Sequence, residues 1–406
     1  MDFEQMGLHP KLIKQIKTLN FTAPTPIQAQ AIPHALKGRD VMGLAQTGTG
    51  KTAAFGLPLL HALLSVGAPA APKGATGLVL APTRELAKQI ADTLGGFVRG
   101  GHLRVALVVG GVSMGRQIET MRKGVDLLIA TPGRLIDLLD RKAVRLDQTR
   151  FLVLDEADQM LDMGFIQALR RIAPLLPRDR QTMMFSATMP KLMADLSAQF
   201  LNDPMKVEVA RRSVTADKVR QELHFVAQEE KTELLMQLMS AHVGQRTLVF
   251  ARTKHGAERL MKKLAAAGFD AASIHGNKNQ SQRDRAIRAF KAAEVTVLVA
   301  TDVAARGIDI PEVTHVYNYD MPNVAENYVH RIGRTARAGA SGQAVAFCAK
   351  DEMSELRAVE KLLKTGIPVV GGESWSSGQP PRKPAANRPA RQRRRPGRGQ
   401  KVSRAA

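Results

Sequence analysis

Eight residues at positions 45–52, "AQTGTGKT", combine the groups that hold phosphate in proteins. Gly48 and Gly50 let backbone N–H groups approach phosphate oxygens, Lys51 supplies positive charge, and the Thr52 hydroxyl is a ligand for Mg²⁺. The usual spacing of a phosphate loop has glycine where this chain has Ala45, so a glycine turn that only caps a helix stays the alternative. The segment predicts a nucleotide site made of Ala45, Gln46, Thr47, Gly48, Thr49, Gly50, Lys51 and Thr52.

A second segment, "FLVLDEADQM" at residues 151–160, places Asp155, Glu156 and Asp158 directly after four apolar residues. Carboxylates this close repel one another, and burial adds to the cost of each. A strand that ends in acids is the pattern of a Walker B segment, in which Asp155 holds Mg²⁺ and Glu156 orients or deprotonates the attacking water. The metal and Lys51 would supply the compensating charge. The alternative is that the acids only cap the next helix.

These loops need strands to position them, and short apolar runs predict such strands. The first half of the chain contains "DVMGLAQ", "GLVLAPT", "RVALVVGG", "DLLIATP", "FLVLDEAD" and "TMMFSAT". The runs do not alternate with polar residues, as expected of parallel strands that are buried on both faces. Stretches between them, such as residues 86–98, predict helices. This order predicts an α/β fold with an open parallel sheet.

The same rhythm restarts after residues 209–218, with "ELHFVAQ", "TLVFART", "AASIHGN", "VTVLVATD", "HVYNYD" and "GQAVAFCA". The sequence therefore predicts two α/β domains, at residues 1–210 and 217–365. From residue 366 the composition changes to Pro, Gly and Arg, with almost nothing to bury. Residues 366–406 are predicted to form a disordered basic tail.

The composition points to a polyanionic partner. The formal net charge of the 406 residues is +22, of which residues 366–406 carry +9 and the remainder +13. This excess favours nucleic acid over a membrane surface. Cys348 is the only cysteine, so no disulfide can form within the chain, which suits a reducing cytoplasm. "MDFEQMGLHP" does not resemble a signal peptide, and no run of 18 apolar residues predicts a membrane span.

Residues 155–158 spell DEAD, and the chain resembles the DEAD-box RNA helicases, in particular the bacterial RhlE-like members. The resemblance extends over residues 2–365 and rests on a dozen motifs in the family's order. It implies two tandem RecA-like domains, ATP and Mg²⁺ as cofactors, and RNA as the partner. A phosphate-loop kinase or a transporter ATPase would not explain the motifs in the second half.

The resemblance also implies roles around the ATP. In "FTAPTPIQ", Phe21 would stack on adenine and the amide of Gln28 would bond to its edge. The hydroxyls of Ser186 and Thr188 in "SAT" would bond to the DEAD carboxylates and link the ATP state to RNA binding. Asp309 would also contact the nucleotide.

"YVHRIGRTARAG" at residues 328–339 spaces three arginines by three residues, so that one helical face could present them together. The resemblance makes Arg334 and Arg337 arginine fingers for the γ-phosphate, beside Arg331. The family usually has glycine where this chain has Ala336, and a tighter local backbone without loss of function is expected.

The remaining motifs match the family's RNA-contacting loops, and Gly and Thr backbone amides, hydroxyls and single arginines suit a sugar–phosphate backbone. Aromatic residues make up only 4% of the chain, so base-specific readout is not indicated. The predicted RNA-binding residues are Pro82, Thr83, Arg84, Gly110, Gly111, Thr131, Pro132, Gly133, Arg134, Arg252, Thr253, His275, Gly276, Gln280, Arg283, Thr301 and Asp302.

The resemblance predicts local, non-processive unwinding of short RNA duplexes, or remodelling of RNA–protein complexes, driven by ATP. It further implies work in ribosome assembly, RNA decay or growth in the cold, with ribosomal precursors or the RNA-degradation machinery as partners and no membrane. The alternative is an ATP-gated RNA clamp or annealing chaperone, in which hydrolysis serves only release. A basic tail, which binds RNA without regard to sequence, would suit that alternative.

Overall fold

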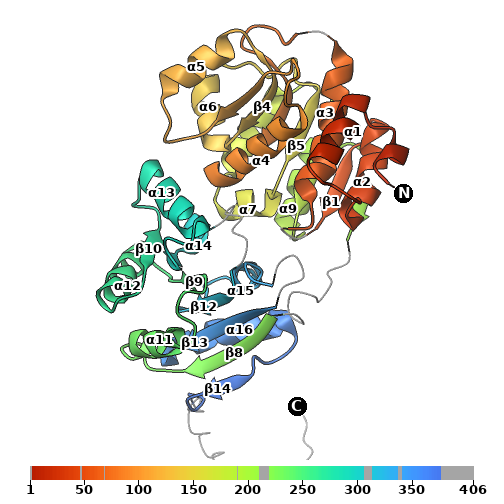
Figure 1. Ribbon diagram of the computed structural model, residues 1–406. Coiled ribbons are helices and arrows are strands. Elements are labelled where there is room, and N and C mark those ends of the chain that lie inside the picture. Colours follow the sequence, from red (N-terminus) through yellow and green to blue (C-terminus); the bar gives the residue numbers. More distant parts are fainter. Residues whose placement is uncertain are drawn as a thin grey trace, which may run out of the picture. The chain divides into compact units, whose positions relative to one another are not determined.

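The structure is a computed structural model, and it describes residues 2–45, 48–67, 69–189, 191–209, 219–305, 313–336 and 341–375. Within these ranges the strands form two parallel sheets of seven strands each (Figure 1). The first sheet has the order β3-β4-β2-β5-β6-β1-β7 and the second β10-β11-β9-β12-β13-β8-β14. Numbered from the start of each domain, the two orders are identical. The predicted α/β class with two parallel sheets is confirmed.

The strands of the first sheet are β1 (Val41–Leu44), β2 (Ala75–Leu80), β3 (Val105–Val108), β4 (Val125–Ala130), β5 (Phe151–Leu154), β6 (Gln181–Ser186) and β7 (Met205–Glu208). Those of the second sheet are β8 (Val219–Phe225), β9 (Thr247–Phe250), β10 (Ala271–Ile274), β11 (Val297–Ala300), β12 (His315–Asn318), β13 (Gly342–Cys348) and β14 (Val369–Gly371).

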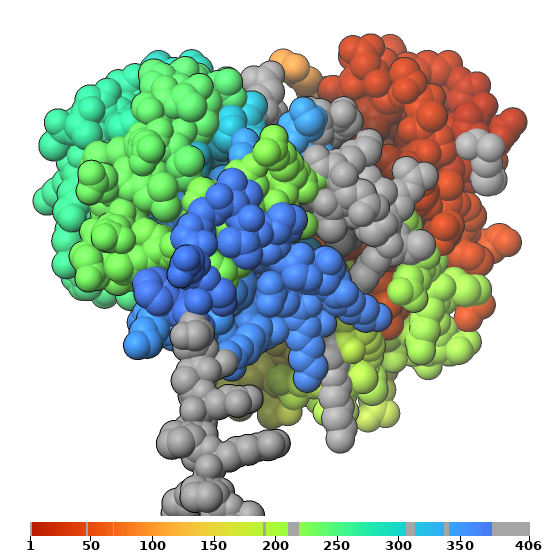
Figure 2. All heavy atoms as spheres, turned by 90° about the horizontal axis from the view of Figure 1, so that it is seen from below, coloured from red at the N-terminus to blue at the C-terminus, as the bar shows by residue number. Residues whose placement is uncertain are grey.

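Sequence patterns missed the last strand of each sheet, β7 and β14. Both are edge strands with one hydrogen-bonded neighbour, so they need not be apolar on both faces. Only Val207 is buried in β7, and Val369 and Val370 of β14 are more than half exposed. Figure 2 shows this C-terminal part of the second domain in blue, on the surface. Since β14 pairs with β8, ordered chain continues beyond the boundary predicted at residue 365.

Helices cover both faces of the first sheet. One apolar cluster gathers η1 (Glu4–Met6), α1 (Pro10–Thr18), α2 (Pro26–Leu36), α3 (Lys51–Val66) and α4 (Arg84–Phe97) on one face. A second cluster gathers α5 (Met114–Arg122), α6 (Pro132–Asp140), α7 (Ala157–Asp162), α8 (Ile166–Ile172), η2 (Ala173–Leu175) and α9 (Lys191–Phe200) on the other. Neighbouring strand residues such as Leu128 and Ile129 belong to opposite clusters, because side chains alternate along a strand.

The second sheet is covered in the same way. The helices α11 (Lys231–Ser240) and α12 (Lys254–Ala266) pack on one face, and α13 (Gln280–Lys291) and α14 (Asp302–Ala305) contribute to the apolar cluster of the other. The remaining elements are α15 (Ala325–Ile332), η4 (Lys350–Glu352) and α16 (Met353–Leu363), and α15 packs beside α16. Among the described helices, none has the length and apolar character needed to cross a bilayer.

Parallel strands bring their carboxyl ends to one edge of a sheet, where open α/β sheets bind ligands. In the first sheet, residues 45–52 follow β1, the acids follow β5 and "SAT" ends β6. In the second sheet, Thr301 and Asp302 follow β11. The fold therefore places most of the predicted site at two such edges.

Candidate nucleotide and RNA site

One pocket collects residues from most of the predicted nucleotide motifs. It is lined by Phe21, Gln28, Gly48, Gly50, Lys51, Thr52, Ala53, Leu86, Gln89, Thr93, Asp155, Glu156 and Arg334. Gln46 and Thr47 lie outside the described residues. The pocket brings the phosphate loop, the acids and the adenine-side residues together. Leu86, Gln89 and Thr93 come from α4, and no sequence motif had singled them out.

The phosphate loop needs its glycines for conformation. Gly48 and Gly50 have φ of 84° and 89°, and a side chain at Gly50 would meet Nε2 of Gln28 at 2.5 Å. Ala45 is not among the residues with positive φ, and its N–H continues the ladder to Ser186 O at 2.9 Å. An alanine is therefore compatible with this position, and the departure from the usual spacing has no structural cost.

Lys51 begins α3 and is buried, with an exposed fraction of 6%. Within the described residues its Nζ has no hydrogen-bond partner. A buried ammonium group without such a partner is costly, so its place is explained by a ligand that brings negative charge. Thr52 lines the same pocket.

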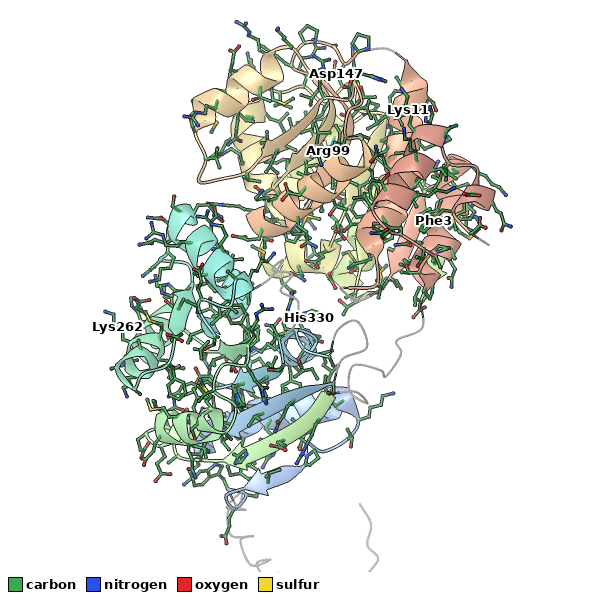
Figure 3. All side chains as sticks on the ribbon, viewed as in Figure 1. Phe3, Lys11, Arg99, Asp147, Lys262 and His330 are labelled. Carbon is green, nitrogen blue, oxygen red and sulfur yellow. The ribbon has the colours of Figure 1, made fainter. Side chains whose placement is uncertain are left out.

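The side chain of Gln28 ties the adenine-side motif to the phosphate loop. Its Nε2 donates to Gly50 O at 3.0 Å, and its Oε1 accepts from Thr25 N at 2.9 Å. One Nε2 hydrogen and one Oε1 lone pair are left to read an adenine edge. Phe21 packs against Phe97 at 5.4 Å and against Phe3, which Figure 3 labels, at 6.5 Å between ring centroids.

The acids after β5 are buried together. Asp155 and Glu156 are 2% and 3% exposed, and Glu156 adopts a φ of 50°, which is strained for a residue with a side chain. Burial raises the pKa of Asp155 well above its usual range, Lys51 opposes that shift, and the Glu156 charge adds to it. A dication beside Asp155 would favour its ionised form.

The predicted link between "SAT" and the acids holds for Thr188. Asp158 Oδ2 accepts from Ala187 N at 3.1 Å, from Thr188 N at 2.9 Å and from Thr188 Oγ1 at 2.9 Å. The hydroxyl of Ser186 instead donates to Thr188 O at 2.7 Å. In this structure the Ser186 hydroxyl is therefore engaged by the turn after β6, and its bond to the acids stays a prediction.

Arg331 and Arg334 of "HRIGRTAR" do not share a helical face, contrary to the prediction. α15 ends at Ile332, and Arg331 is buried with its guanidinium bonded to both carboxylate oxygens of Asp302, at 2.6 and 2.8 Å. Arg334 lies beyond the helix and lines the nucleotide pocket. Arg337 and Asp309 lie outside the described residues. Ala336 has a φ of 54°, a region that favours glycine.

The RNA residues predicted in the first domain come together on three loops. Thr83 caps α4, its Oγ1 accepting from Leu86 N at 3.2 Å. A Cβ on Gly110 or Gly111 would run into the guanidinium of Arg84, so this glycine pair makes room for the arginine. Arg134, on α6 with the neighbouring Thr131, Pro132 and Gly133, donates to Val112 O at 3.0 Å.

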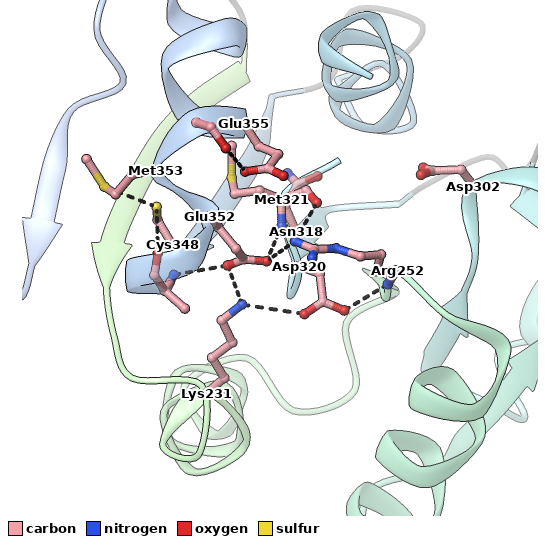
Figure 4. A network of polar contacts seen from close by, with 12 residues as sticks. Lys231, Arg252, Asp302, Asn318, Asp320, Met321, Cys348, Glu352, Met353 and Glu355 are labelled. Atoms are coloured by element: carbon pink, nitrogen blue, oxygen red, sulfur yellow. Dashed lines mark hydrogen bonds and ion pairs between the residues drawn. The ribbon is translucent and has the colours of Figure 1, made fainter. Parts of the chain in front are cut away.

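In the second domain the charged ends of two predicted RNA side chains, Arg252 and Asp302, are paired with other side chains of the domain. Nη2 of Arg252 lies 2.6 Å from Glu352 Oε1 (Figure 4), and Thr253 caps α12 by accepting from Gly256 N. The carboxylate of Asp302 is taken by Arg331. The charged ends of Arg252 and Asp302 are therefore engaged within the domain, and so is the backbone N–H of Arg252, which donates to Asp320 Oδ2 at 2.8 Å.

The other predicted RNA residues of the second domain lie on α13 and the loop before it. Gln280 Oε1 accepts from Arg84 Nη1 at 3.1 Å, and Arg283 Nη2 lies 2.9 Å from Glu85 Oε1. His275, followed by Gly276, is 4% exposed, and its Nε2 lies 3.0 Å from Oε2 of Glu258. The hydroxyl of Ser273, then His275 and Lys278, lower the pKa of Glu258 to about 2. Sequence reasoning missed Glu258.

Comparison with known proteins gives two matching family models, "DEAD/DEAH box helicase" at residues 25–196 and "Helicase conserved C-terminal domain" at residues 230–339. The ATP-dependent RNA helicase CshA of Listeria monocytogenes is 42% identical over 373 residues, which cover 92% of this chain and 71% of that protein. CshA of Limosilactobacillus reuteri is 44% identical, over 90% of this chain and 72% of its own. The chain belongs to the DEAD-box family of ATP-dependent RNA helicases.

Solved structures of DEAD-box helicases agree. S. cerevisiae Dbp5 bound to RNA and ADP BeF3 has a TM-score of 0.81 at 32% identity, covering 92% of this chain and 96% of that one. Mss116p bound to ssRNA and AMP-PNP has a TM-score of 0.82 at 28% identity, covering 91% and 78%. The two sheets therefore match tandem RecA-like domains, and the activity of the chain is that of an RNA-dependent ATPase and helicase.

Proposed function

We propose that this DEAD-box protein uses ATP to separate short RNA duplexes locally and non-processively, or to remodel RNA–protein complexes. The pocket that unites Gln28, Lys51, Asp155, Glu156 and Arg334 carries the proposal. It offers one face for adenine, a cation and backbone amides for phosphates, a carboxylate for water and an arginine for the charge that develops. These are the parts that phosphoryl transfer to water requires.

Each residue has a separate task. Lys51 and the N–H groups of residues 45–52 bind the phosphates, and Phe21 and Gln28 bind the adenine. Glu156 orients the attacking water and accepts its proton. Arg334 and, from the sequence, Arg337 stabilise the γ-phosphate, a contribution of about 10³- to 10⁵-fold in rate for an arginine finger.

The donors in the pocket fit Mg²⁺. Thr52 contributes a hydroxyl and Asp155 a buried carboxylate, and Mg²⁺ prefers such oxygen ligands together with water and substrate phosphates. The bound ion would supply positive charge to the phosphate oxygens. Asp155 would hold it directly or through water.

RNA is bound through its backbone. The loops at Arg84, Gly110–Gly111 and Arg134 in the first domain offer guanidinium and N–H groups, and those at Thr253 and Gly276 in the second offer chiefly backbone groups. Such contacts position the chain without reading sequence. We also propose that the basic residues beyond Trp375 tether RNA electrostatically.

The cellular setting follows from the family. We propose work in the cytoplasm, in ribosome assembly, RNA decay or cold growth, with residues 1–210 and 217–365 as the functional halves. Membership of the RhlE-like subgroup stays a prediction, since the relatives named above are CshA proteins.

The test uses Glu156→Gln, which keeps the shape of the side chain and removes its charge. ATP and RNA should still bind, while RNA-stimulated hydrolysis and strand displacement fall by about 10²- to 10⁴-fold, as expected for loss of a general base. Glu119→Gln on α5, where Glu119 forms an exposed ion pair with Arg122, is the matched control. If wild-type protein hydrolysed ATP but never displaced a strand, the clamp or annealing function would replace unwinding.

A further inference from the structure

The second domain completely buries a lysine and surrounds it with carboxylates. Lys231, the first residue of α11, has an exposed fraction of 0%, and its Nζ lies 2.6 Å from Oε2 of Glu352 and 3.4 Å from Oδ1 of Asp320. A buried ammonium group is tolerated only with opposite charge close by. Neither Lys231 nor Glu352 has a part in the contacts with ATP or RNA proposed above.

Lys231 stands at the point of the second sheet that Lys51 occupies in the first. The two sheets have the same strand order, and each lysine is the first residue of the helix that follows the first strand of its sheet. In both places the lysine is followed by threonine. Asp155 follows the fifth strand of the first sheet directly, and Asp320 comes two residues after the fifth strand of the second.

The carboxylate of Glu352 is held as a bound oxyanion would be (Figure 4). Its Oε2 accepts from Lys231 Nζ at 2.6 Å and from Ala349 N at 3.0 Å. Its Oε1 accepts from Arg252 Nη2 at 2.6 Å and from Met321 N at 3.1 Å. Two cations and two backbone N–H groups around one anion form the donor set that proteins use for phosphate.

We propose that the carboxylate of Glu352 takes, in the second domain, the place that a nucleotide phosphate takes in the first. The cradle around Lys231 is an oxyanion site that the chain closes with its own side chain. The inference rests on the phosphate role proposed for Lys51. Because Glu352 belongs to the domain, the cradle stays filled whether or not ATP is bound.

Through Lys231, which bonds to both Glu352 and Asp320, the carboxylate of Glu352 also positions groups that act on RNA and ATP. The backbone N–H of Arg252, in a proposed RNA loop, donates to Asp320 Oδ2 at 2.8 Å. The carbonyl of Asp320 accepts from Arg331 Nη1 at 2.7 Å, three residues before Arg334. Glu352 is therefore a positioning residue, connected through Asp320 and Arg331 to the segment that carries the proposed arginine finger.

The test removes the carboxylate and offers a small oxyanion in its place. In the full chain carrying Lys51→Met, which disables the first phosphate site, Glu352→Ala leaves Lys231 and Arg252 facing a vacated cradle. We expect Glu352→Ala to lower the unfolding temperature, and acetate or inorganic phosphate to restore it relative to chloride at equal ionic strength. At about ten times its dissociation constant, the anion should raise the folded-to-unfolded ratio about tenfold.

Three further variants, in the same Lys51→Met chain, control this result. Adding Lys231→Met to Glu352→Ala removes the cation and should abolish the response to acetate. Glu355→Ala makes the same change three residues along, at a side chain whose hydrogen bond is to Ser354, and Glu352→Asp keeps a carboxylate; both should respond to acetate no more than the parent. If Glu352→Ala does not fold, the titration is run as refolding followed by circular dichroism. Equal responses with and without Lys231 would overturn the proposal.

A second readout, with Lys51 intact, separates positioning from packing. Glu352→Ala should raise the RNA concentration for half-maximal ATPase, and acetate should lower it again, while ATP affinity without RNA stays unchanged. An unchanged RNA requirement in a folded variant would refute the positioning role. A wild-type ATPase without RNA stimulation would refute the proposed function instead, and the anion-dependent folding would be judged on its own data.

Discussion

The two domains bury a lysine at the same point of the same topology, and the two lysines differ in their partners. Lys51 is 6% exposed, and its Nζ has no hydrogen-bond partner within the described residues. Lys231 is 0% exposed and bonded to Glu352 and Asp320. A charge buried without a partner lowers stability and attracts a ligand, whereas a paired one fixes its surroundings. On the roles proposed above, the difference distinguishes a lysine that binds phosphate from a lysine that holds loops in place.

The same contrast extends to the arginines. In the first domain Arg84 lies over the glycine pair and donates to the neutral amide of Gln280, while in the second domain the charged ends of Arg252 and Arg331 are bonded to the carboxylates of Glu352 and Asp302. Satisfied buried networks rigidify the parts that they join. We infer that RNA meets side chains mainly in the first domain and a preset backbone mainly in the second.

The largest expected effects come from replacing each lysine by methionine. Lys51→Met should reduce ATP hydrolysis by about 10²-fold or more, as expected for loss of a charge that stabilises the transition state. It should change the free energy of unfolding little, because Nζ of Lys51 has no hydrogen bond to lose within the described residues. Lys231→Met should destabilise by about 3–5 kcal/mol, because it leaves Glu352 buried without its lysine.

The measurements are ATP affinity, turnover with RNA, and urea unfolding of both variants. Folded Lys231→Met should still bind ATP without RNA. The assignment of Lys51 to ligand binding and of Lys231 to structure would be contradicted if Lys51→Met proved the more destabilising, or if Lys231→Met abolished ATP binding. Lys88→Met, at an exposed ion pair with Asp92, is the control for the loss of a lysine and should be close to wild type.

Local patterns were enough to predict much of this molecule. The phosphate loop could be identified from the glycines beside Lys51 after a strand, and the acidic site from the carboxylates at the end of another strand. Each motif lies within a few residues. The pairing of Lys231 with Glu352 could not be predicted, because the two are far apart in the sequence and each resembles an ordinary surface residue. The ion pair of Arg252 depends on the same distant carboxylate. The edge strand β14 lacks the apolar pattern that identified the buried strands.

The next effect concerns the glycine pair that makes room for Arg84 in the first domain. Gly111 has a φ of 73°, and a Cβ there would displace the Arg84 guanidinium. Gly111→Ala should therefore raise the RNA concentration for half-maximal ATPase about tenfold. It should also lower the free energy of unfolding by about 1–2 kcal/mol, because alanine is strained at a positive φ. Arg84→Ala should act similarly, and the double variant should be no worse than either one.

Gly115→Ala is the control, since a Cβ at Gly115 has open space and the residue lies in α5. Additive effects of Gly111→Ala and Arg84→Ala would mean that the glycine acts on RNA through its own backbone. In that case the first domain, like the second, would contact RNA through fixed backbone groups, and the two domains would differ less in how they bind RNA.

A pH effect should arise in the second domain. His242 and His315 stack at 3.6 Å between ring centroids, and burial, then the neighbouring His242, lowers the pKa of His315 to about 4. The unfolded chain takes up a proton as pH falls through about 6.5 and the folded chain does not, so stability falls between pH 6.5 and 4. Since the ring is half-buried, we expect a loss of only about 1–2 kcal/mol.

Urea unfolding at pH 7 and pH 5 measures this loss. His242→Phe keeps a ring in the stack and removes one of the two imidazoles, so the difference between the two pH values should shrink. The exposed His102→Phe leaves the stacked pair in place and serves as the control. A pH difference as large in His242→Phe as in wild type would assign it to groups outside the pair.

The smallest effects concern the end of the chain, and they depend on where the second domain stops. Residues 376–406 carry ten basic residues and no acid, so truncation after Trp375 removes phosphate-binding charge without touching β14. RNA binding should weaken severalfold and its salt slope should flatten by about 0.7 for each lost phosphate contact on single strands. The maximal ATPase rate and the unfolding temperature should not change.

Truncation after Thr365 should show the same loss of RNA binding and a lower unfolding temperature as well, because β8 loses its neighbour β14 and Leu223 N loses its bond to Pro368 O at 2.8 Å. Equal RNA affinities and salt slopes for the full chain and the chain ending at Trp375 would exclude the RNA tether and favour a tail that binds a protein.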